Sequence, residues 1–210
     1  MRKKSVNAYV LTFVGVMAAM VYVVTLFRFP LLGSKVHFAN AVCLLAGMLL
    51  GPWWGGAAAG LGSALYDALA GGYDFINVLI TFVSKFAMAF VCGILMRNTA
   101  ISREEHPVRT IAAAVGGALM RRRDQEENLV RVILASVCGA LTYVALYMLK
   151  TFIYQRFVYG YPMDAVGATM VAKLIPSLIN AAVAVVAAPV FYHALRPALR
   201  SAGMWEKLRA

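Results

Sequence analysis

Polar and charged side chains recur at helical spacing inside three strongly apolar stretches of the chain. Asn77, Thr81 and Lys85 follow one another every four residues, so they share one face of a helix. Two later stretches carry similar stripes: Tyr143, Tyr147, Lys150 and Tyr154 in one, and Lys173, Ser177 and Asn180 in the other. Because polar groups are costly in a membrane and usually face a cavity or the bundle interior, the stripes predict one polar pocket.

The residue types in these stripes favour ligand binding. Tyrosine rings stack on flat rings, and lysine ammonium groups suit carbonyls, carboxylates or phosphates. We therefore expect a small planar heterocycle with polar substituents, without selecting one compound. Four residues near the predicted outer turns are expected to close over it, namely His37, Asn40, Tyr73 and Asp74.

Structural roles compete with binding at several of these positions. Tyr154 also suits an interfacial aromatic belt, and Lys150 is near enough to the outer end to extend its ammonium group to water. Ser177 and Asn180 also suit ordinary hydrogen bonds between helices, and His37 a structural role in a loop. Lys85 lies deepest, so it needs a partner: either Asp67 or Asp74 in an ion pair, or a ligand.

The composition places these stripes in a membrane. The 210 residues are 62% hydrophobic and 14% charged, with a mean hydropathy of +0.75, whereas soluble domains are about 45–50% apolar and about 25% charged. Residues 36–96 contain only three charged side chains, those of Asp67, Asp74 and Lys85. This pattern excludes a disordered chain, a disulfide-rich scaffold and a nucleic-acid-binding globule.

The apolar runs predict an all-α polytopic membrane protein, a compact bundle of six transmembrane helices forming a single membrane domain over residues 1–210. The expected spans are residues 8–27, 36–50, 53–70, 75–96, 129–154 and 166–195. Five spans remain the alternative, because the second and third are short and share one turn at Gly51-Pro52. Residues 97–128 are expected to form a cytoplasmic segment, with a surface helix near residues 111–120 that is too short to span.

The basic residues predict the orientation of the bundle. Three clusters hold 14 of the 20 lysines and arginines: at the N-terminus, in or beside residues 97–128, and at the C-terminus. Since cytoplasmic loops carry excess Lys and Arg, both termini are expected in the cytoplasm, with the protein in the plasma membrane. The net charge of +11 then reflects orientation and not a nucleic-acid partner.

Small residues and cysteines give weaker indications of function than the polar stripes. Gly15 and Ala19 form a small-xxx-small pair in the first span, which suits either internal packing or a partner's helix. Cys43, Cys92 and Cys138 lie in apolar runs without metal-ligand spacing, so we expect packing roles and no metal.

Two blocks of sequence resemble the membrane substrate-binding (S) components of energy-coupling factor (ECF) transporters. They are VHFANAVCLLAGMLLGPWWGG at residues 36–56 and GLGSALYD at residues 60–67. TFVSK at residues 81–85, Pro176 and Asn180 extend the similarity, which covers about 150 residues. The closest resemblance is to the riboflavin-type branch, which includes proteins assigned to pyridoxine or hydroxymethylpyrimidine.

This resemblance implies a vitamin site near the outer face, covered by the loop after the first span and built from the last three spans. It also implies a complex with a transmembrane coupling subunit and two cytoplasmic ATPases, which hydrolyse the ATP, so that the chain itself needs no cofactor. The family's contact with the coupling subunit maps onto Gly15 and Ala19, with glycine where alanine is usual.

Two other classes of function remain as alternatives. A stand-alone secondary transporter usually needs an internal repeat and a membrane-embedded acid; we find no repeat, and Asp67 and Asp74 lie near an outer turn. An intramembrane protease would need Gly-x-Ser-Gly with a deep histidine, or His-Glu-x-x-His, and neither motif occurs. Dependence of uptake on protons or on ATP would separate transporter classes.

Overall fold

The computed structural model describes residues 8–27, 29–31, 34–104 and 117–209. In this part of the chain five helices are long and apolar enough to cross a membrane. Their bounds are α1 Ala8–Leu26, α2 Ala39–Leu69, α3 Phe75–Glu104, α5 Gly117–Ile153 and α6 Met163–Ser201. A short helix, α7 Met204–Arg209, follows α6.

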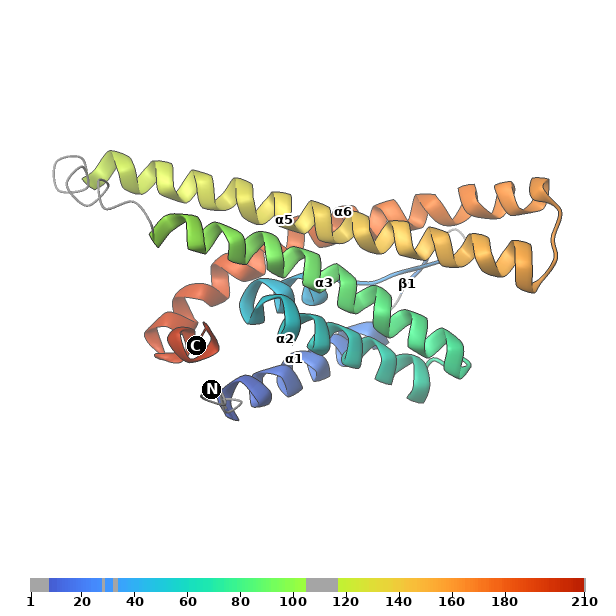
Figure 1. Ribbon diagram of the computed structural model, residues 1–210, viewed down its shortest axis with the longest axis horizontal. Helices are drawn as coiled ribbons and strands as arrows, with labels where there is room; N and C mark the ends of the chain where they lie inside the picture. Colours follow the sequence, from blue (N-terminus) through green and yellow to red (C-terminus); the bar gives the residue numbers. More distant parts are fainter. Residues whose placement is uncertain (1–7, 28, 32–33, 105–116, 210) are drawn as a thin grey trace, which may run out of the picture.

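The helix ends divide between the two ends of the bundle (Figure 1). The start of α1, the end of α3, the start of α5 and α7 lie toward one end, whereas the α2–α3 and α5–α6 connections lie toward the other. These described helix ends adjoin the three basic regions in the sequence, and they lie on one side, as the charge pattern predicts for one side of a membrane.

The expected count of six spans is not confirmed, because the second and third expected spans are two limbs of α2. Gly51 interrupts this helix with φ 78° and ψ −174°, a conformation open almost only to glycine. The first limb, residues 39–50, is about 18 Å long at about 1.5 Å per residue. That is well short of the roughly 30 Å hydrocarbon thickness of a bilayer.

The two limbs of α2 fold back closely on each other. A Cβ added to Gly55 would lie 2.6 Å from the Gly47 Cα and 2.5 Å from the Ala46 carbonyl oxygen, a proximity impossible for residues eight apart in a straight helix. Pro52 starts the second limb, where the missing N–H of proline costs little. Glycine and proline thus give the chain its reversal here, and small residues allow the close packing.

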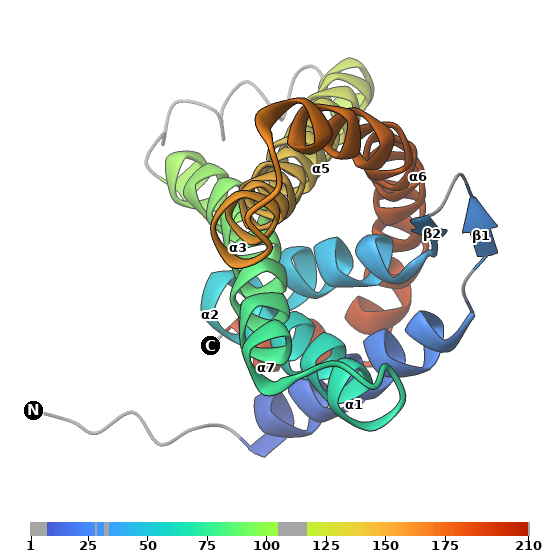
Figure 2. The ribbon, with the colours of Figure 1, turned by 90° about the vertical axis from the view of Figure 1, so that its right-hand side faces the viewer.

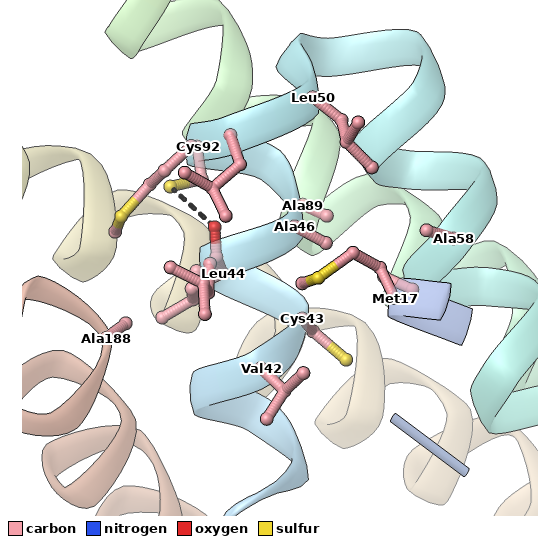
Figure 3. Packing of buried hydrophobic residues seen from close by; sticks show 14 of the residues in the cluster. Met17, Val42, Cys43, Leu44, Ala46, Leu50, Ala58, Ala89, Cys92 and Ala188 are labelled. Atoms are coloured by element: carbon pink, nitrogen blue, oxygen red, sulfur yellow. Dashed lines mark hydrogen bonds between the residues drawn. The ribbon is translucent and has the colours of Figure 1, made fainter. Parts of the chain in front are cut away.

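The core of the protein is built around α2. Of its most apolar 18-residue window, 78% is buried, against 33–39% in the other four long helices. In the first limb, Leu44 and Leu45 are almost fully buried. Figure 3 shows this limb beside Ala89 and Cys92 of α3 and Ala188 of α6, with the Cys92 thiol 3.8 Å from the Leu44 carbonyl oxygen. A helix surrounded by protein explains how a limb too short to span is accommodated.

The segment expected to be a cytoplasmic loop, residues 97–128, is largely helical where the structure describes it. Helix α3 continues to Glu104, and α5 already begins at Gly117. The expected surface helix at residues 111–120 falls partly outside the described residues, and residues 117–120 form the start of α5. Hydropathy marks only the lipid-embedded length of a helix, which explains why the polar extensions were not predicted.

Two connections shape the opposite end of the bundle. Between α1 and α2, strands β1 Phe29–Leu31 and β2 Ser34–Val36 pair as an antiparallel hairpin in which Phe29 is opposite Val36; a loop was expected here. β2 contacts α6, and Figure 2 shows the hairpin beside α6 and the first limb of α2 between α3 and α6. At the end of α5, a π-helical turn, Tyr154–Val158, precedes Gly160.

Candidate binding cavity

A cavity of about 580 Å³ opens among α2, α3, α5 and α6, within the usual range for small-molecule sites. Its lining includes all fourteen residues that the sequence analysis selected as ligand-binding candidates. These are His37, Asn40, Tyr73, Asp74, Asn77, Thr81, Lys85, Tyr143, Tyr147, Lys150, Tyr154, Lys173, Ser177 and Asn180. The geometry thus brings the three stripes together, while their role in binding stays a prediction.

The short first limb of α2 helps to create this space. Asn40 is the second residue of that limb and lines the cavity, so the limb begins beside the cavity. Asn40 is 2% exposed and Lys85 of α3 is 4% exposed. The Lys85 ammonium donates a hydrogen bond to Asn40 Oδ1 and lies 3.8 Å from the centroid of the Tyr143 ring. Three helices therefore meet at one buried cation.

The ion pair considered for Lys85 does not form. Among the described residues, no carboxylate oxygen lies within 4.0 Å of its ammonium nitrogen. Asp74 precedes α3 by one residue, so about 16 Å of helix separates its level from that of Lys85 at about 1.5 Å per residue. The protein contacts of Lys85 are thus a neutral amide and an aromatic face.

Asp74 lies at the exposed rim, where it caps α3. Its carboxylate accepts hydrogen bonds from the Asn77 backbone N–H, at 3.3 Å, and from the Asn77 side-chain amide, in the manner of an N-terminal helix cap. The Asn77 side-chain hydrogen bond is the main reason why the pKa of Asp74 lies below its ordinary value, and the Lys150 charge adds to this effect. The rim therefore carries a stable negative charge.

The α5 wall is aromatic. The rings of Tyr143 and Tyr147 are stacked, with centroids 6.2 Å apart and an interplanar angle of 21°. Lys150 lies 5.7 Å from the centroid of the Tyr154 ring, so this lysine also has an aromatic neighbour. Tyrosine faces spaced along one helix offer a stacking surface to a flat ligand.

The α6 wall joins the cavity to the segment that follows the hairpin. Asn180 Oδ1 accepts a hydrogen bond from the His37 backbone N–H at 3.0 Å, across 143 residues of sequence. The Ser177 hydroxyl instead donates to the Lys173 carbonyl oxygen of its own helix, at 2.7 Å. Asn180 thus bonds to the segment between β2 and α2 and not to another helix, whereas the Ser177 hydrogen bond stays within α6.

Eight lining residues were not among the predicted binding residues. They are Thr25, Ser63, Asp67, Ile80, Ser84, Thr151, Gln155 and Tyr159. A signal existed for three of them, because Thr151, Gln155 and Tyr159 continue from Tyr147 at steps of four. Gln155 Oε1 is buried without a hydrogen-bond partner among the described residues, which marks it as an acceptor available to a ligand.

The small-residue pair of α1 lies on the outside of the protein. Gly15 and Ala19 are both exposed, and a Cβ added to Gly15 would meet nothing within 4 Å. Internal packing, one of the two roles considered for this pair, is thus not what Gly15 provides. The face is open to lipid or to another helix.

Comparison with known proteins places the chain in a family. The family model described as "ECF-type riboflavin transporter, S component" matches residues 5–197, which is nearly the whole chain. A search of curated proteins gives no match. The match agrees with the resemblance of the blocks at residues 36–67 and with five apolar helices long enough to cross a membrane. The chain is a multi-pass membrane protein that belongs to the S components of ECF-type riboflavin transporters, a family of transport subunits and not of enzymes.

Proposed function

We propose that this S component captures a planar heterocyclic vitamin or vitamin precursor from the exterior and holds it in the cavity between α2, α3, α5 and α6. A riboflavin-like ring and a pyridoxine- or hydroxymethylpyrimidine-like ring are the two candidates. The observation that carries the proposal is a 580 Å³ cavity lined by stacked tyrosines, lysines and amides, in a chain of this family.

The orientation follows from charge. The cavity lies away from the start of α1, the end of α3 and the start of α5, the helix ends that adjoin the basic regions in the sequence, and basic segments favour the cytoplasm. Both termini are then cytoplasmic, the cavity faces the exterior, and the membrane is the plasma membrane. The hairpin and His37 cover the ligand from the outer side.

In this proposal the chain binds the vitamin and other subunits supply the energy for transport. A transmembrane coupling subunit and two cytoplasmic ATPases would complete the importer, and ATP would be used by the ATPases alone. The exposed Gly15 and Ala19 of α1 form the proposed contact with the coupling subunit, because small side chains let another helix approach closely. The S component itself uses no cofactor.

Mass spectrometry of small molecules that co-purify with the detergent-solubilised protein, expressed alone, tests the proposal. Nanomolar affinity corresponds to about −12 kcal/mol, and affinity differences mostly reside in the dissociation rate, so a tight ligand should survive purification. A flavin or a B6- or pyrimidine-type compound is the expected result. No bound compound, and no thermal stabilisation by a vitamin panel, would contradict the proposed function.

A matched pair of substitutions tests the aromatic wall. Tyr147→Phe retains the ring that stacks on Tyr143, whereas Tyr147→Leu removes it. Since aromatic pairs contribute about 0.5–1.5 kcal/mol beyond area burial, we expect Tyr147→Leu to weaken ligand binding by about twofold to tenfold relative to Tyr147→Phe. Isothermal titration of the ligand identified above measures this ratio, and equal affinities would exclude stacking at this position.

A further inference from the structure

Among the residues that the structure describes, no carboxylate pairs with the Lys85 ammonium group. Lys85 is 4% exposed, and its described contacts are Asn40 Oδ1 and the Tyr143 ring. An ammonium group has three N–H donors, so at least one N–H is left for a group in the cavity. An uncompensated buried charge is strongly unfavourable, which makes this position incomplete without an anion.

The two acidic residues that line the cavity, Asp67 and Asp74, interact electrostatically with Lys150. Asp74 is also bound by Asn77. Three lysines line the cavity (Lys85, Lys150 and Lys173) against two carboxylates, a formal surplus of one positive charge. The surplus is thus located at the deep end, where Lys85 is farthest from the rim.

We propose that the ligand carries an ionised carboxylate or phosphate, and that this anionic group binds against Lys85 beside Asn40 and Tyr143. This inference rests on the proposed function and narrows its substrate class from planar heterocycles in general to acidic ones. Asn40 contributes its amide N–H groups to the same anion, because its Oδ1 already accepts from Lys85. The heterocycle itself then lies along Tyr143 and Tyr147.

The test compares an acidic probe with its uncharged counterpart on the full-length protein in detergent, after removal of any co-purified compound. Riboflavin 5′-phosphate against riboflavin probes a phosphate, and pyridine-3-carboxylate against pyridine-3-carboxamide probes a carboxylate. We expect the wild-type protein to bind the acidic member of at least one pair about tenfold more tightly, and the pair concerned identifies the anion.

Substitutions then assign the preference to Lys85. Lys85→Met removes the charge at similar volume and should reduce the acidic preference to about twofold or less, whereas Lys85→Arg should retain it. Lys150→Met, at the other lysine that lies over a tyrosine ring, should lower the affinities of both members by the same factor. If Lys85→Met fails to fold, Lys85→Gln takes its place, and the wild-type comparison needs no variant.

The outcomes separate the two proposals. If the wild-type protein binds the uncharged member of both pairs as tightly as the acidic one, or if Lys85→Met keeps the acidic preference, the anionic ligand is refuted while vitamin capture stands. If the wild-type protein binds none of the four probes and no vitamin, the proposed function fails, and this inference fails with it.

Discussion

At the scale of single residues, the contact between Lys85 and Asn40 makes an unusual stability prediction. Asn40→Ala leaves a buried ammonium without its amide acceptor and should lower the free energy of unfolding by about 1–3 kcal/mol. Lys85→Met removes the buried charge itself, a change that is often neutral or stabilising. Thermal unfolding of the ligand-free protein in detergent measures both effects.

The double variant provides the control for this pair. Once Lys85 is Met, Asn40→Ala no longer strands a charge, so its cost should be smaller than in the wild-type background. Non-additivity of this kind is the expected signature of direct contact. Equal costs in the two backgrounds would mean that the hydrogen bond contributes nothing to stability.

Asp74 predicts a pH dependence at the rim. Its folded-state pKa is lowered, mainly by the Asn77 side-chain hydrogen bond, so its stabilising effect is present above the unfolded value of about 3.9 and is lost as the pH falls through the folded value. We expect the Tm of the wild-type protein to fall more steeply than that of Asp74→Asn below about pH 5. Scanning fluorimetry across that range checks this, and parallel curves would contradict the prediction.

Helical periodicity selected ten of the fourteen predicted binding residues, those of the three stripes, because residues three or four apart share a helix face whatever the rest of the fold does. The other four, His37, Asn40, Tyr73 and Asp74, were selected by their place near the predicted outer turns, and all fourteen line one cavity. Isolated polar residues such as Thr25 and Ser63 carried no such signal. The contact of Lys85 with Asn40 could not be predicted from the sequence either, because it depends on how α2 and α3 are rotated relative to each other.

At the scale of elements, two glycines of the α2 reversal are expected to act for different reasons. Gly51→Ala meets no atom within 4 Å, so its cost of about 1–3 kcal/mol comes from the backbone conformation alone. Gly55→Ala keeps a helical backbone but collides with Ala46 and Gly47, for a similar overpacking cost of about 1–3 kcal/mol.

Gly167→Ala on α6 is the matched control, because its added Cβ meets nothing within 4 Å and alanine is the better helix former by about 1 kcal/mol. We expect Gly167→Ala to raise the Tm slightly while the two α2 variants lower it. If Gly55→Ala were as stable as Gly167→Ala, the result would contradict the close packing of the two α2 limbs described above.

The number of spans was the part of the fold that hydropathy could not determine. The residues before and after Gly51-Pro52 are both apolar, and two short spans give the same pattern as one helix that reverses inside the protein. What distinguishes them is burial by neighbouring helices, which depends on contacts distant in sequence. The β1–β2 hairpin was missed because three-residue strands leave no periodicity to read.

At the scale of the whole molecule, ligand capture and partner docking are predicted to be separable. Gly15→Leu and Ala19→Leu enlarge side chains on the exposed face of α1. Neither residue lines the cavity. We expect both to reduce co-purification of the coupling subunit by at least tenfold while ligand affinity stays unchanged. Val190→Leu, on the exposed side of α6, is the control.

Affinity purification from cells that co-express the coupling module measures complex formation, and titration of the isolated subunit measures ligand binding. Loss of both properties together would indicate misfolding, and retention of the complex in both variants would move the contact away from this face of α1.

The short limb of α2 also has a consequence for how the protein is made. A segment of this length does not partition stably into lipid on its own, and exposed backbone ends are not tolerated in hydrocarbon. The insertion machinery must therefore accept the two limbs together, with protein contacts replacing lipid around the first. Those contacts come partly from α3 and α6, which are synthesised later. Nascent chains that stop before α3 should accordingly be short-lived substrates of membrane quality control.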